Sequence, residues 1–284
     1  MPHRQHNYYP TILGAAHLVI LYIFIQTIVD FPLAVWDYFH GTSLLYHPVK
    51  KYVMGIGSVA FILIYGYKRA HTRITELFPI RRFNPLLLIP MITFILGAQL
   101  FLGQINQTVN QWIPAPPWFM ELFDKIFNNK LGWWGAFLKV VVVAPIIEES
   151  IFRGIIMHGL MRNYPKIVAI FISALFFALF HLNPWQFPAT FLLGLLVGWI
   201  MVITRNLFAC ILGHAINNLL VLLSITYYQQ LNEQAFFLQP IKDQAKTGYF
   251  LATFSVVILA VFAIQQSKKA KSQLASASEQ PEAE

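Results

Sequence analysis

Residues 140–154 read VVVVAPIIEESIFRG, within a longer apolar run that extends from about residue 132 to residue 160. The run has the length and hydropathy of a helix that crosses a bilayer. It nevertheless contains two adjacent acids, Glu148 and Glu149, and Arg153 follows four residues after the second. An ionisable side chain at bilayer depth costs at least ~2.5 kcal/mol on insertion scales. We therefore expect a transmembrane helix that carries a functional site.

The composition of the whole chain fits the same class of protein. Of its 284 residues, 57% are hydrophobic and only 11% are charged, whereas about a quarter of a soluble domain is charged. Eight separate apolar runs predict an all-α, polytopic helical membrane bundle with about eight transmembrane helices, since about 20 residues cross the hydrocarbon as helix. The predicted spans are 11–31, 49–67, 85–104, 132–160, 166–182, 188–204, 206–227 and 247–266.

The net charge of +8 reflects membrane topology, because the basic residues are scattered through loops and do not indicate nucleic-acid binding. Lys and Arg are in excess on the side shared by both termini, which predicts cytoplasmic termini for an integral protein of the cell membrane. That side carries Arg4, Lys68, Arg69, Arg73, Arg81, Arg82, Arg162, Lys166, Arg205, Lys268, Lys269 and Lys271, against Lys50, Lys51, Lys125, Lys130, Lys242 and Lys246 opposite.

The pattern divides the chain into four parts. Residues 1–131 hold N-terminal transmembrane helices and, near 118–130, an amphipathic segment that is typical of an interfacial helix. Residues 132–228 carry the polar motifs, 229–266 form a loop and the last transmembrane helix, and 267–284 have the composition of a disordered cytoplasmic tail. Asp30, in the first span, is interpreted as a packing or interface group.

Chemically capable side chains occur in three of the predicted spans. Glu149 and Arg153 are four apart on one helical face and can form an ion pair. Glu148 is turned by ~100° from Glu149, free to face His181 in the fifth span. A water held between Glu148 and His181 could lose a proton to them, as general base catalysis requires.

The seventh span supplies a second pair of polar side chains. His214 and Asn218 are four apart on one face and can both donate toward a common point, as an oxyanion hole requires. Counted from the cytoplasmic helix ends, Glu148 and His181 lie ~21–23 Å deep but His214 only ~12 Å. If all four residues meet, either the seventh helix tilts or begins later, or the predicted span boundaries are wrong.

The order of these motifs resembles a known family. Glu148-Glu-x-x-x-Arg153, Phe177-x-x-x-His181 and His214-x-x-x-Asn218 are similar to the motifs of the CPBP family. These are the CAAX-processing and bacteriocin-processing intramembrane endopeptidases, also called the Abi or type II CAAX prenyl endopeptidase family. The resemblance covers roughly residues 135–225 and makes residues 132–228 the expected CPBP-type catalytic core.

The resemblance implies a role for each motif residue. Glu148 and His181 would activate the hydrolytic water, and His214 and Asn218 would stabilise the oxyanion. Glu149, Arg153 and Phe177 would support the site. It favours a glutamate-dependent mechanism like that of CAAX prenyl protease 2, with no cofactor. The residues themselves leave a zinc site open, with Glu148, His181 and His214 as its three ligands.

The sequence thus predicts an integral-membrane endopeptidase that cleaves a membrane-embedded or lipid-modified peptide or protein at or within the lipid bilayer. Two alternatives use the same residues differently. A proton-coupled transporter would employ the buried carboxylates and imidazoles as a relay. A non-catalytic immunity or scaffold protein would use them only to tie helices together.

Overall fold

The computed structural model of the chain describes residues 8–42, 44, 48–82, 84–117 and 132–227, together with positions 251, 254, 255 and 258. Within these ranges every element of regular secondary structure is a helix, and no strand occurs. The predicted all-α fold is confirmed for this part of the chain.

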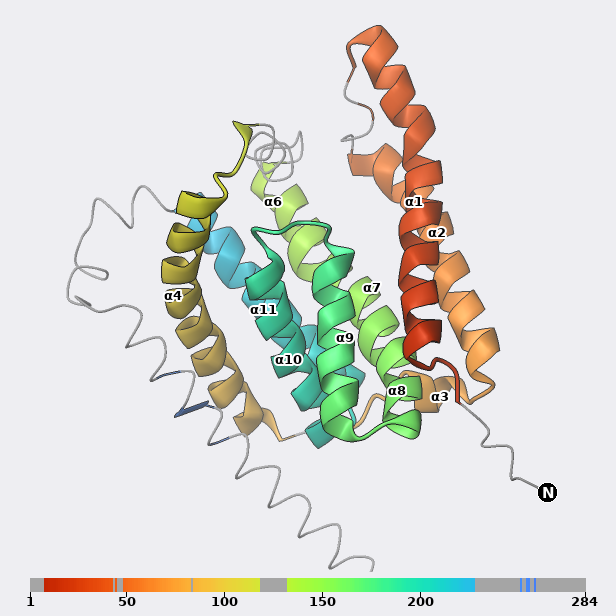
Figure 1. Ribbon diagram of the computed structural model, residues 1–284, viewed down its shortest axis with the longest axis vertical. Helices are drawn as coiled ribbons and strands as arrows, with labels where there is room; N and C mark the ends of the chain where they lie inside the picture. Colours follow the sequence, from red (N-terminus) through yellow and green to blue (C-terminus); the bar gives the residue numbers. More distant parts are fainter. Residues whose placement is uncertain are drawn as a thin grey trace, which may run out of the picture.

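The first two helices, α1 (Ile12–His40) and α2 (Pro48–Ala70), pack together on one flank of the bundle (Figure 1). The Thr11 side chain accepts a hydrogen bond from the Gly14 amide and caps α1. The predicted end at residue 31 is wrong, because the helix continues through Pro32 to His40. Polar residues near Asp30 lower the local hydropathy but do not stop the helix. Gly41 ends it in a left-handed conformation, φ 60°.

The span that carries the two glutamates is a continuous helix from Gly132 to Asn163 with two π-helical stretches. Its segments are α6 (Gly132–Ala136), the π-helical η3 (Phe137–Val143), α7 (Ala144–Glu149), the π-helical η4 (Ser150–Ile156) and α8 (Met157–Asn163). Backbone angles stay right-handed helical at every junction, so the segments form one rod (Figure 1). π-Helical turns are rare and frequently mark functional sites. Here they bracket the short segment that holds Glu148 and Glu149.

Two helices pack against this rod, α9 (Lys166–Phe180) and α11 (Leu207–Thr226), and α10 (Phe187–Thr204) packs against both of them. Their bounds agree with the predicted spans to within two residues. Gly194 lets α10 approach α9 closely, since a Cβ there would lie 2.9 Å from Cα of Ala174. Asn206 caps α11 by accepting from the Phe208 amide, and the Leu207 amide donates to the Pro79 carbonyl.

On the opposite flank, α4 (Leu88–Trp112) follows the short 3-10 turn η2 (Pro85–Leu87) and packs on α10 and α11. It extends beyond the predicted end at residue 104. The connection from α2 to η2 contains one further short helix, α3 (Ile74–Leu77), which lies beside α8 (Figure 1). An ion pair of 2.9 Å joins Glu76 of α3 to Arg162 of α8.

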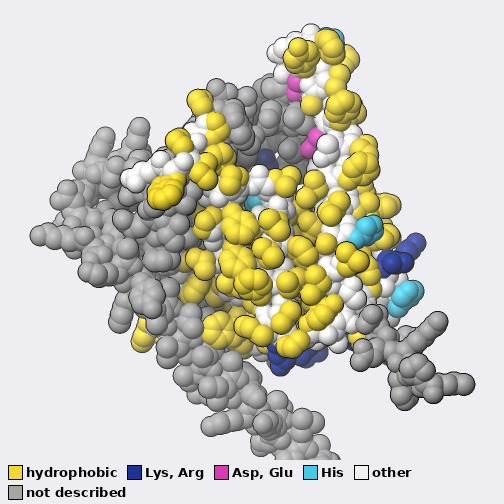
Figure 2. Space-filling model, viewed as in Figure 1, with side chains coloured by type: hydrophobic (Ala, Val, Ile, Leu, Met, Phe, Trp, Pro, Cys, Tyr) yellow, Lys and Arg dark blue, Asp and Glu magenta, His cyan; other side chains and the backbone are white. Residues whose placement is uncertain are grey.

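The outward surface of the bundle is apolar. Figure 2 shows a face dominated by hydrophobic side chains, with basic side chains at its lower edge, where α8 ends and α9 begins. Among the described residues, α1, α10 and α11 are long and apolar enough to cross a membrane, and 85–99 and 166–180 form shorter apolar helices. The interfacial helix at 118–130 and the tail at 267–284 lie outside the described residues, as does most of 247–266, so the count of eight spans stays a prediction.

Candidate active site

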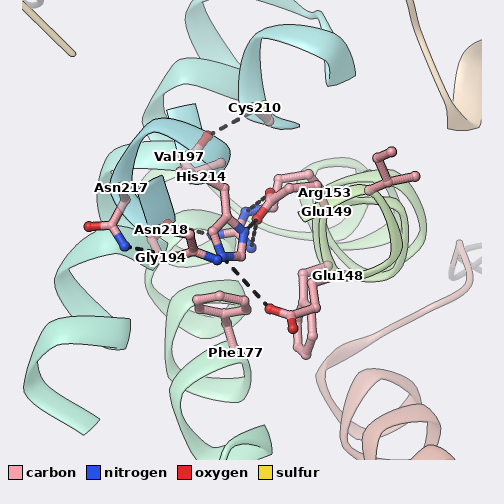
Figure 3. Close-up of polar contacts among 12 residues, drawn as sticks. Glu148, Glu149, Arg153, Phe177, Gly194, Val197, Cys210, His214, Asn217 and Asn218 are labelled. Atoms are coloured by element: carbon pink, nitrogen blue, oxygen red, sulfur yellow. Dashed lines mark hydrogen bonds and ion pairs between the residues drawn. The ribbon is translucent and has the colours of Figure 1, made fainter. Parts of the chain in front are cut away.

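Three chemically capable side chains from different helices meet inside the bundle. Oε2 of Glu148, on α7, lies 4.0 Å from Nε2 of His181 at the end of α9 and 3.9 Å from Nε2 of His214 on α11. Figure 3 shows Glu148 and His214 facing each other. The side chains of Glu148 and His181 are 18% and 22% exposed, and that of His214 only 3%. The structure therefore brings both imidazoles to one carboxylate, at a place water can reach.

This convergence resolves the mismatch of depth between His214 and the other two residues. Residue counts alone put His214 about 10 Å nearer the cytoplasmic end than Glu148, yet their polar atoms are 3.9 Å apart. Since α11 begins at Leu207, as predicted, the helices cannot all be parallel and start at one level. Residue counts therefore place His214 wrongly, because they give relative depths only for parallel helices that start at the same level.

A buried ionic cluster lies directly behind His214. Nε of Arg153 is 3.1 Å from Oε2 of Glu149, and its NH1 donates to Oε1 at 3.2 Å. Both side chains are fully buried. Nδ1 of His214 lies 2.8 Å from Oε1 of Glu149, and the Arg153 NH2 donates to the Gly194 carbonyl at 3.1 Å. The ion pair is as predicted, whereas the bond between Glu149 and His214 was not anticipated.

These hydrogen bonds fix which nitrogen of each imidazole faces Glu148. Nδ1 of His214 points at a carboxylate, and Nδ1 of His181 lies 2.8 Å from the Phe177 carbonyl. Both partners accept, so both Nδ1 atoms carry the proton. The Nε2 atom of a neutral imidazole then presents a lone pair. Two lone pairs and a carboxylate oxygen thus converge, an arrangement that requires a proton donor such as water, or a cation, between them.

Phe177 forms the wall between the two imidazoles. Its fully buried ring lies edge-on to His181 at 5.0 Å and to His214 at 5.5 Å between centroids. The Arg153 guanidinium lies 4.7 Å from the centroid of the same ring, within the range of a cation–π contact. Phe177 therefore fixes the orientation of both imidazole rings and packs against the charged guanidinium of Arg153.

All of these residues lie in one segment that matches a known family. Residues 130–220 match the family model of the type II CAAX prenyl endopeptidases described as Rce1-like. Residues 130–220 are an Rce1-like domain. No curated protein and no solved structure matches the chain closely enough to be compared with it. The chain is therefore an integral membrane protein that carries a domain of the CAAX-protease type.

The Rce1-like domain raises the question of a catalytic metal, since two imidazoles and a carboxylate can bind zinc. Zinc bonds of ~2.0–2.1 Å in a tetrahedron would put ligand atoms about 3.4 Å apart, closer than the 3.9–4.0 Å measured around Glu148. Among the described residues, no group of three or more His, Cys, Asp or Glu is arranged to hold a metal ion.

Asn218 makes a contact with the rod that sequence reasoning missed. Its Nδ2 donates to the Val140 carbonyl at 2.8 Å. The Ala144 amide, which would serve Val140 in an α-helix, donates to Lys139 instead. The π-helical pattern would call on residue 145 next, but Pro145 has no N–H. Asn218 satisfies a carbonyl that the helix itself cannot.

A chain of side-chain amides leads from α4 to this contact. Nε2 of Gln99 donates to Oδ1 of Asn217 at 3.2 Å, and Nδ2 of Asn217 donates to Oδ1 of Asn218 at 3.0 Å. Gln99 lies outside the Rce1-like domain, and no motif in the sequence indicated its role. The sequence does carry one signal for this role of Asn218: Pro145 lies five residues after Val140 inside an apolar helix.

Proposed function

We propose that this protein is an intramembrane endopeptidase in which Glu148 and His181 activate a water molecule that attacks a peptide carbonyl. The observation that carries this proposal is the convergence of the Glu148 carboxylate and two imidazole Nε2 atoms within an Rce1-like domain. A water donating to two acceptors sits ~2.8 Å from each. Separations of 3.9–4.0 Å are too long for direct hydrogen bonds and suit such a bridge.

The reaction follows from the hydrogen-bonding roles of the three groups. Glu148, with His181 beside it, takes a proton as the water oxygen attacks the carbonyl carbon, and the carbonyl oxygen becomes an oxyanion. Collapse of this intermediate breaks the C–N bond, and the proton passes to the leaving amine. Glu148 is regenerated as a carboxylate, so the cycle consumes one water and needs no other reactant.

The proposed oxyanion hole uses His214 and Asn218. His214 can donate from Nε2 only as an imidazolium, and the Glu149 carboxylate at its Nδ1 lies where it balances that charge. The Asn218 amide has a second N–H besides the one directed at Val140. Both donors are on α11 and can act on one oxygen.

The test is the loss of cleavage in a Glu148→Gln variant. Membranes carrying wild type or the variant would be compared by proteomics for C-terminal fragments that depend on Glu148. We expect turnover to fall by about 100- to 10,000-fold. Glu76→Gln, which removes an acid from the exposed α3, is the matched control and should cleave normally. Undiminished cleavage by Glu148→Gln overturns the proposal, and solute-dependent proton flux without peptide products would favour the transporter alternative.

We further propose that the reaction needs no metal. Activity of purified protein should survive 1,10-phenanthroline, and elemental analysis should find less than one zinc per active chain. Inhibition that added zinc reverses would assign Glu148, His181 and His214 as ligands instead.

The proposed substrate is a membrane-embedded or lipid-modified peptide, and both termini are proposed to be cytoplasmic. Cys210, the single cysteine of the chain, is buried, so introduced cysteines report topology cleanly. A membrane-impermeant maleimide added to intact cells should label Thr42→Cys, in the opposite loop, and leave Thr72→Cys unlabelled until the cells are opened. The reverse pattern would invert the orientation.

A further inference from the structure

A cavity of about 380 Å³ lies beside the candidate active site, and most of its lining comes from α1, outside the part of the chain that the family comparison covers. Its walls come from one face of α1, which contributes Gln26, Thr27 and Asp30 among others, and from Phe180 and Leu182. The last two flank His181 directly in the chain. Ligand sites have volumes of roughly 300–1,000 Å³, so the cavity can hold one substrate side chain.

Asp30 provides the one acidic group of this largely apolar lining. Its Oδ1 atom is buried and finds no hydrogen-bond partner among the described residues. A buried carboxylate oxygen without a partner is unfavourable in a membrane, and ionisable residues within membrane segments usually mark functional sites. Gln26 is occupied differently, because its Oε1 accepts from the Ser58 hydroxyl of α2 at 2.7 Å. Asp30 is therefore the group in this cavity that remains available to a donor.

Tyr22 packs against the segment that carries His181. Its ring stacks on Phe180 with centroids 5.1 Å apart and an angle of 14° between the planes. Phe180 directly precedes His181, whose Nε2 lies 4.0 Å from the Glu148 carboxylate. Asp30 lies eight residues further along α1, about 12 Å. An extended peptide advances ~3.3 Å per residue, so a side chain in the cavity would lie within about four residues of the bond at Glu148.

Leu182 lies between the candidate active site and the cavity. It adopts a left-handed conformation, φ 50°, immediately after His181, which is uncommon for a residue other than glycine. The bend ends α9 at His181, and it makes Leu182 part of the cavity wall. The same turn therefore presents the imidazole to Glu148 and opens the space next to it.

We propose that this cavity is a specificity subsite that accepts a lysine or arginine side chain of the substrate, with its apolar stem along Phe31 and Phe180 and its cationic end at Asp30. This assignment rests on the proposed peptidase function. Long basic side chains combine an apolar stem with a charged end, which matches a cavity with largely apolar walls and one carboxylate whose Oδ1 has no partner among the described residues. The substrate class is thereby narrowed to membrane peptides with a basic residue within about four positions of the scissile bond.

A binding experiment tests the subsite without requiring turnover. The full chain in phosphatidylcholine nanodiscs would be titrated with butylguanidinium and with butylurea, a neutral molecule of nearly the same shape. Wild type should bind butylguanidinium at least tenfold more tightly, and Asp30→Asn should abolish this preference. Asp37→Asn, on the same helix but bonded to Thr42, should retain it, as should Glu148→Gln. Ala34→Phe should weaken both probes by filling the cavity. Equal affinity of wild type for the two probes, or a preference that survives Asp30→Asn, overturns the proposal.

A cleavage experiment separates the subsite from the proposed function. Membrane peptides with arginine or norleucine at each of the four positions on either side of the cleaved bond would be compared by kcat/KM. The ratio for arginine over norleucine should fall at least tenfold in Asp30→Asn and not in Asp37→Asn. An unchanged ratio with cleavage that still depends on Glu148 would sink the subsite alone. Absence of cleavage by wild type would sink the proposed function, and the butylguanidinium titration would then decide the subsite.

Discussion

Nδ1 of His214 and Oε1 of Glu149 lie 2.8 Å apart in the fully packed interior of the bundle. The second glutamate of the Glu-Glu pair is thus a partner of an imidazole of the candidate active site as well as of Arg153. Glu148 is partly exposed between the two imidazoles, whereas Glu149 is buried and bonded to His214 and Arg153. The two adjacent residues should consequently respond to substitution in different ways.

Glu149→Gln should destabilise the protein far more than Glu148→Gln. Removing the Glu149 charge leaves the buried Arg153 guanidinium unpaired, which costs about 3–5 kcal/mol, whereas Glu148 is partly exposed and has two histidines as its neighbours. Thermal unfolding in nanodiscs measures the difference. Adding Arg153→Met to Glu149→Gln should restore much of the stability. Equal unfolding temperatures for the two single variants would contradict this division of roles.

Substitutions of Asn218 and Pro145 should have non-additive effects on the free energy of unfolding. Asn218→Ala leaves the Val140 carbonyl without a donor and should cost about 1–3 kcal/mol. In a Pro145→Ala background residue 145 has an N–H that can serve this carbonyl, so the same substitution should cost about 1 kcal/mol less. A double-mutant cycle on unfolding free energies measures the coupling. Strict additivity would show that Asn218 does not complete the helix.

Gly194→Ala should be more harmful than Gly198→Ala. A methyl group at Gly194 would lie 2.9 Å from Cα of Ala174, in the backbone of α9, whereas at Gly198 the nearest atom is a side-chain methyl of Ile170 at 3.3 Å. Overpacking against backbone costs about 1–3 kcal/mol, and the Ile170 side chain can shift. Unfolding temperatures of the two variants give the ranking. A larger decrease in unfolding temperature for Gly198→Ala than for Gly194→Ala would contradict this prediction.

The ion pair between α3 and α8 should give the protein a component of stability that is lost in acid. The Thr72 hydroxyl, which donates to Glu76 at 2.9 Å, and the Arg162 guanidinium hold the pKa of Glu76 below its ordinary value. A lowered folded-state pKa favours folding above the unfolded value near 4.5 and stops doing so as pH falls through the folded pKa. The unfolding temperature of wild type should thus exceed that of Glu76→Gln at pH 7, with the gap closing as pH drops below 4. A difference in unfolding temperature that stays constant with pH would show that Glu76 is not the source of this acid-sensitive stability.

Hydropathy predicted the helices that are apolar throughout and failed where the chain becomes polar. α9, α10 and α11 are uninterrupted apolar segments, and their bounds were predicted to within two residues. α1 and α4 continue beyond the predicted ends, to His40 and Trp112. Hydropathy reports where lipid would be tolerated, whereas the backbone hydrogen bonds of a helix persist past that limit.

Motif spacing predicted the partners within a helix better than those between helices. The Glu149–Arg153 pair follows from a separation of four residues. The contacts of Glu149 with His214 and of Gln99 with Asn217 depend on how helices lie against each other, which no single sequence encodes in its local pattern. The π-helical stretches were equally hidden, because their extra residue changes the register without changing the composition.

Those stretches also have an implication for how the site tolerates length changes. A π-helical turn accommodates one more residue than the α-helical turn it replaces, and one residue corresponds to about 100° of rotation. Deleting a single residue from η3 would convert its wide turn into an α-helical turn and leave the glutamate pair facing the same neighbours. The same deletion in α7, which has no extra residue to lose, would rotate one end of the rod by about 100° relative to the other. Single-residue deletions are therefore expected to be tolerated within η3 and η4 and strongly counter-selected in α7, between them.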